Sequence, residues 1–256
     1  MTRPDPFSAF RLDGKAALVT GAGRGIGLGA VRALCAAGAA VTLVARTRGE
    51  IDAAAAELTG QGGAATALAL DVTDLAAVTE AVGRHGPFDI LVNNAGTNRP
   101  APFLEVTAED FDVLFGLNVR AAYFVAQAVA RGLAAAGRPG AIVNISSQMG
   151  HVGAENRSVY CATKHAMEGF TKAMAVELGR HRIRVNTVCP TFIETPMITG
   201  FFADDPEFRK TALSKNRLGR LGTVDDVVGA ILYLASDASA LVTGAAFKVD
   251  AGWTAS

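Results

Sequence analysis

The sequence has no excess of charge of either sign, and this absence excludes two classes of partner. Its 24 Lys and Arg residues balance 24 Asp and Glu residues, and the sequence pI is about 6.9. A protein that binds nucleic acid or an anionic membrane by charge usually carries a basic surface. We therefore expect neither as a partner.

Cysteine and long apolar runs are also scarce. The three cysteines, Cys35, Cys161 and Cys189, lie far apart and give neither a disulfide framework nor a metal-ligand spacing. No metal site is therefore expected. The first ten residues lack the apolar core of a secretory signal, and no apolar run approaches the length of a membrane span. These absences predict a cytoplasmic protein that is not associated with a membrane.

The chain of 256 residues, half of them apolar, is long enough for one domain with a substantial core. We find no repeat, linker or low-complexity tract that would divide 1–256. Short apolar runs, typical of strands buried on both faces of a sheet, alternate with helical stretches such as 26–37, 51–58 and 75–84. The predicted strands are 15–20, 40–45, 64–70, 88–93, 141–146, 183–188 and 245–249. This alternation predicts an α/β fold of the Rossmann type, a doubly wound parallel sheet of about seven strands with helices on both faces.

Two longer helical segments, 107–136 and 158–180, are apolar around more of their circumference than one packed face requires. The first opens with Thr107 as a cap and Asp110 three residues on, close to a capping box. Either both helices are deeply buried in one subunit, or each has a second face that contacts another subunit. We favour the oligomer.

A glycine-rich loop at 20–27 lies between the first predicted strand and the first predicted helix. Glycines at this place allow a tight turn and let backbone N–H groups approach a pyrophosphate at the helix N-terminus. The chain has 28 glycines, so a chance cluster is the alternative. The position of the loop favours a dinucleotide-binding site.

The end of the second predicted strand indicates which dinucleotide is bound. NAD is usually held there by an acid that contacts the ribose 2′-hydroxyl, but this chain has Ala45 followed by Arg46. Arg24 in the glycine loop adds a second guanidinium, and such groups pair well with a 2′-phosphate. NADP(H) is therefore favoured and NAD(H) remains possible, since the arginines are alternatively ordinary surface charges.

The candidate catalytic residues are Tyr160 and Lys164, with Ser147 upstream of them in the sequence. On a helix, residues four apart share one face, and an ammonium beside a phenol favours the phenolate. Such a pair makes a weak acid useful near neutral pH. Alternatively, Tyr160 is a half-buried phenol beside a solvated amine, with no catalytic role. The dinucleotide-binding glycine loop in the same chain argues against this interpretation.

Taken together, the glycine loop, the run Asn93-Asn94-Ala95-Gly96, and Ser147, Tyr160 and Lys164 resemble the short-chain dehydrogenase/reductase (SDR) family. The resemblance covers about 15–253. It implies a seven-stranded Rossmann-type sheet and a homotetramer, or a homodimer, built through the two long helices. It also implies metal-free oxidoreduction between an alcohol and a carbonyl of a small molecule.

The resemblance implies four catalytic roles. Tyr160 would be the general acid in reduction and the base in oxidation. Lys164 would bind the nicotinamide ribose and lower the pKa of Tyr160, and Ser147 would donate to the substrate oxygen. Asn118 would hold a water that links Lys164 to solvent, although it is alternatively a helix-interior amide with a structural hydrogen bond.

The resemblance also implies most of the positions around the cofactor. Asp71 and Val72 match a pair that contacts adenine, with a capping role as the alternative for Asp71. Ile193 and Thr195 match positions near the nicotinamide carboxamide. With the glycine loop and Arg46, the predicted cofactor-binding set is Gly21, Arg24, Gly25, Ile26, Gly27, Arg46, Asp71, Val72, Asn93, Ala95, Gly96, Tyr160, Lys164, Ile193 and Thr195.

The substrate is less well defined by the sequence. Thr191 stands where the family usually has glycine, and its side chain would narrow the pocket or bond a polar substrate. A lid is predicted at 195–218, over a small ketone, a polyol or sugar, or a 3-oxoacyl compound. His151 is alternatively a surface imidazole. The candidate substrate-binding residues are Ser147, Met149, His151, Asn156, Thr191 and Phe192.

Two other functions stay open at this point. The chain could be a non-catalytic dinucleotide-binding sensor or scaffold, although all four catalytic positions are filled. It could also be a sugar-nucleotide epimerase or dehydratase, for which the length leaves little room for a further substrate domain.

Overall fold

The computed structural model describes residues 5, 7–196, 198–199 and 206–255. Its centre is a seven-stranded sheet in which all neighbouring strands are parallel. The spatial order is β3-β2-β1-β4-β5-β6-β7. The strands are β1 (Ala16–Thr20), β2 (Ala40–Ala45), β3 (Ala64–Ala69), β4 (Ile90–Asn93), β5 (Gly140–Ile145), β6 (Ile183–Pro190) and β7 (Ala246–Val249).

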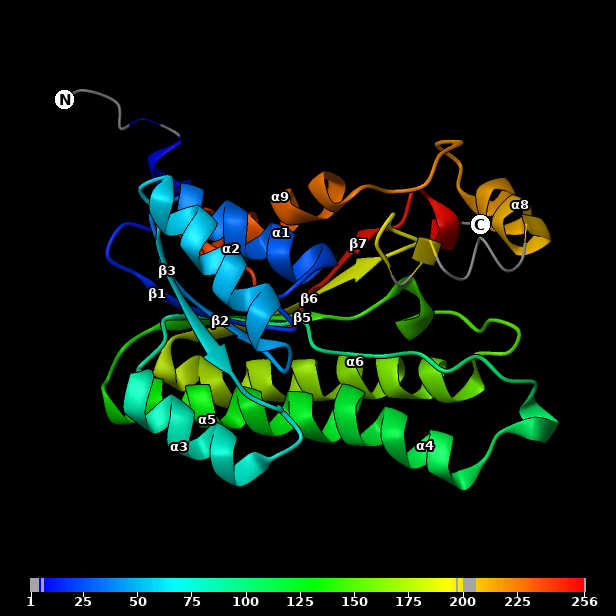
Figure 1. The fold of residues 1–256 in the computed structure, drawn as a ribbon, viewed down its shortest axis with the longest axis horizontal. Helices are drawn as coiled ribbons and strands as arrows, with labels where there is room; N and C mark the ends of the chain where they lie inside the picture. The colour runs from blue at the N-terminus through cyan, green and yellow to red at the C-terminus, as the bar shows by residue number, and fades with distance from the viewer. Residues whose placement is uncertain (1–4, 6, 197, 200–205, 256) are drawn as a thin grey trace.

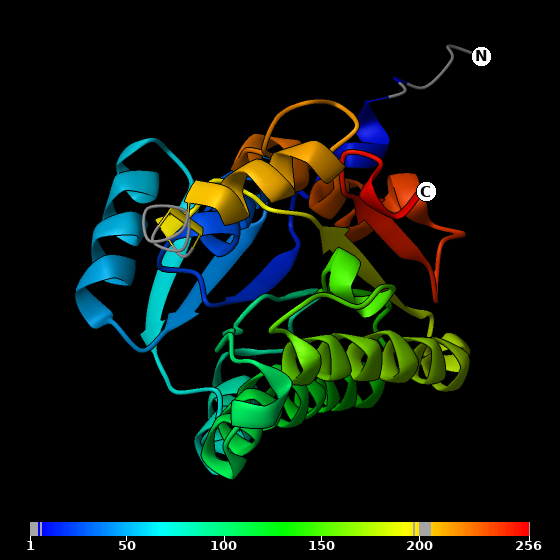
Figure 2. The same ribbon diagram turned by 90° about the vertical axis from the view of Figure 1, so that its right-hand side faces the viewer.

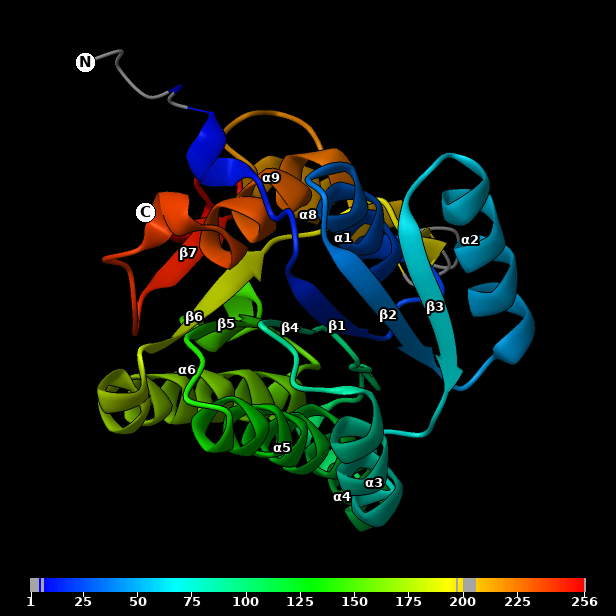
Figure 3. The same ribbon diagram turned by 90° about the vertical axis from the view of Figure 1, so that its left-hand side faces the viewer.

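Helices cover both faces of the sheet (Figures 1 and 3). One layer contains α1 (Gly25–Ala36), α2 (Arg48–Gly60) and α9 (Val224–Ala235). The other contains α3 (Leu75–His85), α4 (Ala108–Phe115), α5 (Ala122–Ala135) and α6 (Ser158–Leu178). Figure 2 shows the two layers above and below the sheet. The predicted α/β fold and its doubly wound parallel sheet are therefore confirmed.

The apolar strands form this sandwich because successive side chains point to opposite faces. Leu18 packs in the cluster beside α3 and α5, whereas the next residue, Val19, packs in the cluster beside α1 and α9. Leu91 and Val92 of β4 divide in the same way. A strand buried on both sides must be apolar at every position, which explains the continuous runs in the sequence.

The strand order reverses between β1 and β4, because β1 pairs with β2 on one side and β4 on the other. Connections from the two strands therefore leave the sheet toward opposite layers and open a crevice at the carboxyl ends of the strands. Doubly wound sheets bind their ligands at such a switch point.

The predicted segment 107–136 forms one continuous helical stretch with a π-helical turn, η3 (Gly116–Ala121), between α4 and α5. Thr107 caps α4 as predicted, since its Oγ1 accepts from the Asp110 N–H at 3.1 Å. By length and hydropathy, Ala108–Ala135 is the one described helix that could cross a membrane, which the sequence pattern did not indicate. Its α5 half packs on α3 and the sheet through buried residues such as Val125 and Leu133, as a core helix does.

Candidate active site

A cleft of about 500 Å³ lies at the carboxyl ends of β1, β2 and β4. The glycine loop forms one wall, the ends of β2 and β3 form another, and the Asn94 region with η3 forms the third. Ten of the predicted cofactor-binding residues line it: Gly21, Arg24, Gly25, Ile26, Arg46, Asp71, Val72, Ala95, Gly96 and Thr195. The sequence did not single out Glu50, Val113 or Leu117, which also line the cleft because α2, α4 and η3 reach it.

The glycine loop has the backbone that a dinucleotide phosphate requires. Gly21 and Gly25 have φ of +62° and +57°, a region that residues with a side chain rarely adopt. A Cβ on Gly27 would collide with the carbonyl oxygen of Gly21 and lie 2.6 Å from Nδ2 of Asn94. The loop therefore packs directly on the first turn of α1, whose N–H groups have no intrahelical partners and face the cleft. These residues fit a dinucleotide.

Asn94 fixes the loop from the neighbouring strand. Its Nδ2 donates to the carbonyl oxygens of Thr20 at 3.0 Å and Gly21 at 3.1 Å, and its own N–H donates to the Thr20 hydroxyl. The amide next to it, Asn93, is buried and lies outside the cleft. Its Nδ2 donates to the Ala122 carbonyl at 2.7 Å, so the structure gives Asn93 a packing contact with α5.

The cleft is lined by as many acidic as basic side chains, with Glu50 and Asp71 as the acidic pair. Arg24 and Arg46 both line it, and Ala45 occupies the strand end where an acid would hold NAD. Hydrogen bonds from Thr73 lower the pKa of Asp71, and the nearby Arg46 charge adds to that effect. Asp71 accepts from the Thr73 N–H at 2.9 Å, so it also shapes the turn after β3.

Four residues of the predicted cofactor set, besides Asn93, do not line the cleft. Ile193 is buried and forms a β-bridge with Gly222. Lys164 is buried, and its Nζ donates to the Ile145 carbonyl at 2.8 Å. Gly27 lies behind the loop, and Tyr160 lines a second, smaller pocket nearby.

That second pocket, of about 70 Å³, holds the predicted catalytic hydroxyls. Ser147 follows β5, while Tyr160 lies in the first turn of α6, and the two hydroxyls interact. A short 3-10 helix, η4 (Gln148–Gly150), sets the direction of Ser147, whose Oγ accepts from the Met149 N–H at 3.1 Å. Two elements distant in sequence thus bring the hydroxyls together.

The electrostatics of Tyr160 differ from expectation. Burial raises the pKa of Tyr160 to about 12, and hydrogen bonding with Ser147 only partly opposes this. The Lys164 Nζ lies 5.6 Å from the centre of the Tyr160 ring, and burial lowers the pKa of Lys164 to about 8. The two residues do share one side of α6, but the protein groups alone favour the neutral phenol, because desolvation outweighs the neighbouring charges.

Asn118 lies in the π-helical turn η3, and its amide is fully used within the protein. Oδ1 accepts from the Thr97 N–H at 2.9 Å, while Nδ2 donates to the Thr97 carbonyl at 2.9 Å and to Thr163 Oγ1 at 3.2 Å. Thr163 in turn donates to the Tyr160 carbonyl at 2.7 Å. A π turn at a functional site is common, and here it links the Thr97 loop to the helix that carries Tyr160.

Only some of the candidate substrate residues line the pocket beside Tyr160. Met149, Thr191 and Phe192 do so together with Ser147. Asn156 lies elsewhere, at a positive φ of 55°, and its carbonyl accepts from the Ala101 N–H. The remaining lining residues, which the sequence did not indicate as candidates, are Asn98, Gln148, Arg157 and Ile198.

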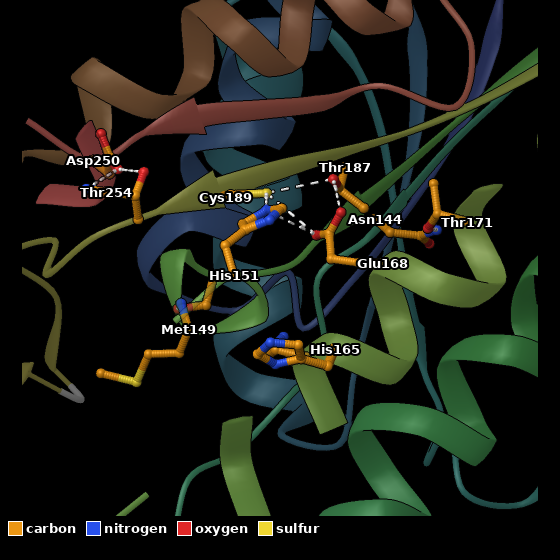
Figure 4. A network of polar contacts seen from close by, with 12 residues as sticks. Asn144, Met149, His151, His165, Glu168, Thr171, Thr187, Cys189, Asp250 and Thr254 are labelled. Carbon is orange, nitrogen blue, oxygen red and sulfur yellow. Dashed lines mark hydrogen bonds and ion pairs between the residues drawn. The ribbon is translucent and has the colours of Figure 1, made fainter. Parts of the chain in front are cut away.

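His151 also points away from this pocket, toward β6 (Figure 4). Its Nε2 lies 3.4 Å from Cys189 Sγ and 3.8 Å from Glu168 Oε1, so it is not a free surface imidazole. Burial lowers the pKa of His151, which favours the neutral ring.

The predicted lid at 195–218 is described in part. Residues 197 and 200–205 lie outside the described residues, and α8 spans Pro206–Lys215. Ile198, Ala212 and Leu213 pack with Met149 and Phe192 in one apolar cluster. These described parts of the segment therefore lie against residues of the pocket that contains Tyr160.

A family model described as enoyl-(acyl carrier protein) reductase, from the SDR family, matches residues 21–254. L-xylulose reductase from Bos taurus is 48% identical over 96% of this chain and 99% of that protein. Gluconate 5-dehydrogenase from Gluconobacter oxydans is 41% identical over the full length of both.

Solved structures of similar proteins have the same fold. The crystal structure of a gluconate 5-dehydrogenase from Burkholderia cenocepacia, in complex with NADP and tartrate, superposes with a TM-score of 0.93. It is 37% identical in sequence, and the match covers 98% of this chain and 100% of that one. The chain thus belongs to the short-chain dehydrogenase/reductase family and is an NAD(P)-dependent oxidoreductase that interconverts a carbonyl and an alcohol.

Proposed function

We propose that this protein reduces a small polyhydroxylated ketone, such as a ketose or a keto sugar acid, with NADP(H), and catalyses the reverse oxidation. The choice of a polyhydroxylated substrate depends on one feature of the pocket. The pocket beside Ser147 and Tyr160 is lined by two amide residues, Asn98 and Gln148, whose buried oxygens Oδ1 and Oε1 have no hydrogen-bond partner among the described residues.

Unpaired buried oxygens are costly, about 1–3 kcal/mol each, and most buried polar groups are bonded. Hydroxyl groups of a substrate would donate to both oxygens and remove that cost. The pocket volume of about 70 Å³ suits a short molecule better than a long acyl chain, so we place the 3-oxoacyl class second. The names of L-xylulose reductase from Bos taurus and D-erythrulose reductase from Gallus gallus, which is 45% identical, support the same choice.

In this proposal the protein places a carbonyl oxygen between the hydroxyls of Ser147 and Tyr160. Tyr160, neutral because of its burial, donates its proton to the oxygen that gains charge during reduction. When bound, the dinucleotide supplies the hydride. Lys164 orients the ribose and replenishes the proton, and Asn118 holds the Thr97 loop and α6 in register.

NADP(H) is the proposed cofactor because Arg24 and Arg46 line the adenosine end of the cleft and Ala45 leaves room where NAD-specific chains have an acid. The NADP in the related gluconate 5-dehydrogenase structure supports this choice. The proposed set of cofactor and catalytic residues otherwise remains as predicted from the sequence, except that Asn93 and Ile193 would act through packing.

A panel of ketoses, keto sugar acids, simple ketones and 3-oxoacyl thioesters, assayed with NADPH and with NADH, tests the proposal. We expect the highest kcat/KM for a hydroxylated ketone with NADPH. A clear preference for a 3-oxoacyl thioester would reject the substrate class. Tight NADPH binding without turnover on any carbonyl would instead favour the sensor hypothesis.

We also propose a homotetramer, or a homodimer, assembled through α4, α5 and α6 in the cytoplasm. Three aromatic side chains of α4 and α5 are partly exposed to solvent: Phe111 is 44% exposed, Tyr123 38% and Phe124 37%. Exposed apolar side chains that are grouped on one surface often mark a contact with another subunit. Tyr123 also stacks edge-on against Phe170 of α6. Analytical ultracentrifugation of the wild type and of Phe124→Glu tests this, with a smaller species expected for the variant.

A further inference from the structure

A cluster of three metal-ligand side chains lies beside the active site, in a place that the proposed reaction does not use. His151 follows η4, Glu168 belongs to α6 and Cys189 belongs to β6 (Figure 4). Their ligand atoms all lie within 4.8 Å of one another. Cys189 and Glu168 are buried, whereas the His151 side chain is 21% exposed and leaves a path from solvent.

The spacing of the three atoms matches three corners of a tetrahedral ion site. Cys189 Sγ lies 3.3 Å from Glu168 Oε1 and 3.4 Å from His151 Nε2, and that nitrogen lies 3.8 Å from Oε1. With Zn–S, Zn–N and Zn–O bonds of ordinary length, tetrahedral corners are roughly 3.4–3.6 Å apart. Small side-chain shifts would therefore bring all three atoms to bonding distance of one ion.

The surroundings of the cluster also suit a cation. The carboxylate of Glu168 is buried, and the only basic group within 4.0 Å of it among the described residues is the His151 ring. A buried carboxylate usually needs an ion or a charged partner. Thr187 Oγ1 donates to Oε2 at 3.0 Å, which leaves Oε1 for the ion and fixes the carboxylate as an outer partner does.

A fourth polar atom stands nearby. Ser146 is 4% exposed, and its Oγ, which lacks a hydrogen bond of good geometry among the described residues, lies close enough to the Cys189 thiol to interact with it. Gly150, next to His151 in the chain, lies against both Ser146 and Glu168, since a Cβ there would be 3.0 Å from Ser146 Oγ. A water on the ion could donate to this hydroxyl, so the cluster offers three protein ligands and one open position.

We propose that His151, Glu168 and Cys189 form a site for a zinc-like divalent cation. Thiolate, imidazole and carboxylate together are a donor set that zinc accepts. On binding, the Cys189 S–H bond breaks, its proton leaves to solvent, and a sulfur–metal bond forms. His151 binds through Nε2, which places the ring proton on Nδ1.

The site is structural and not catalytic, because none of its three ligands lines the pocket of Ser147 and Tyr160. Each ligand instead lies close in sequence to a group in that region. His151 is four residues after Ser147, Glu168 is one helical turn after Lys164, and Cys189 is two residues before Thr191. A bound ion would therefore tie three active-site segments together and stabilise the folded state.

Cobalt and zinc titrations of the metal-stripped protein test this proposal. We expect one Co²⁺ per chain with intense visible bands of tetrahedral cobalt and a sulfur-to-cobalt charge-transfer band in the near ultraviolet. Zn²⁺ should displace the cobalt and raise the Tm. Cys189→Ser should lose the charge-transfer band and weaken Zn²⁺ binding by at least about 100-fold, more than the loss of an outer partner costs.

The matched control is Cys161→Ser, which changes another buried cysteine outside the cluster and should keep the band. His151→Gln provides a second variant at a partly exposed position if Cys189→Ser does not fold. Absence of stoichiometric binding to the wild type would overturn the proposal, as would a charge-transfer band that persists in Cys189→Ser. These outcomes do not depend on the oxidoreductase assay, so they leave the proposed function untouched.

Discussion

The cofactor cleft and the catalytic pocket lie next to each other but are built in different ways. The cleft is wide, about 500 Å³, and its central wall is the backbone of a glycine loop. The pocket is small, about 70 Å³, and side chains from η4, α6 and the end of β6 form it. A local turn supplies one wall of the cleft, whereas the pocket is formed throughout by the packing of side chains from distant segments.

This difference has an electrostatic counterpart. The cleft is lined by Arg24 and Arg46 as well as by Glu50 and Asp71, and the two guanidinium groups suit a phosphate that arrives from solvent. Burial raises the pKa of Tyr160, which lines the pocket, to about 12 and lowers the pKa of the buried Lys164, one helical turn away, to about 8; in both cases it favours the neutral form. The cleft therefore suits the binding of a charged ligand, and the pocket suits proton transfer.

The largest expected effect comes from removal of the proton donor in the pocket. Tyr160→Phe should lower kcat by about 10²–10⁴-fold, the usual contribution of a positioned acid or base. NADPH binding, measured by fluorescence titration, should change little, because Tyr160 lines the smaller pocket and ten other residues of the predicted cofactor set line the cleft. Turnover near the wild-type rate in this variant would remove Tyr160 from the mechanism.

The raised pKa of Tyr160 predicts different pH profiles for the two directions. The neutral phenol is the acid that reduction requires, and it predominates at every pH well below 12. Oxidation requires the phenolate, whose fraction rises about tenfold per pH unit below the pKa. We expect kcat/KM for oxidation to increase steeply from about pH 6 to 9, while that for reduction stays nearly flat. Parallel profiles would show that another group limits the rate.

On the cofactor side, Arg46→Ala should raise the KM for NADPH by about 10–100-fold, since a hydrogen bond to a charged group contributes about 1.5–3 kcal/mol. The KM for NADH should change much less, because NADH lacks the 2′-phosphate. Arg131→Ala, an exposed arginine on α5, serves as the control. Equal losses for both cofactors would mean that Arg46 does not distinguish them.

The glycine loop can be tested by crowding its backbone. In Gly27→Ala the new methyl group would meet the Gly21 carbonyl, and strain of about 1–3 kcal/mol should weaken NADPH binding by roughly tenfold. Gly49→Ala, in the first turn of α2, meets no atom within 4 Å and should bind normally. Titration of NADPH and thermal denaturation measure both variants. Wild-type affinity in Gly27→Ala would show that the contact does not shape the cleft.

The sequence predicted the strands closely because each reads as a short apolar run. The limits of β2 match the prediction, and those of β1 and β3 differ by one residue. β6 continues to Pro190, two residues further than predicted, because Cys189 and Pro190 still pair with β7. The π turn around Asn118 has no comparable pattern in the sequence, since it depends on hydrogen bonds to Thr97 and Thr163.

The substrate pocket and the proposed metal site were harder to predict, because they too depend on contacts between residues that are distant in the sequence. Gln148 and Asn98 are ordinary amides in the sequence, and only packing brings both residues to the pocket and leaves their oxygens without hydrogen-bond partners among the described residues. His151 was expected at the substrate or the surface, but η4 turns it toward Cys189, 38 residues away in the chain. No sequence spacing marks such a contact.

By itself the sequence determined the sheet, the glycine turn and the helical pairing of Tyr160 with Lys164. These depend on local periodicity and on backbone conformations that particular residues allow. Only the tertiary structure decided the burial of Tyr160, the partners of His151 and the composition of the substrate pocket. All three depend on side chains that lie far apart in the sequence and that shield one another from water in the folded chain. No single segment of the sequence contains both members of such a contact.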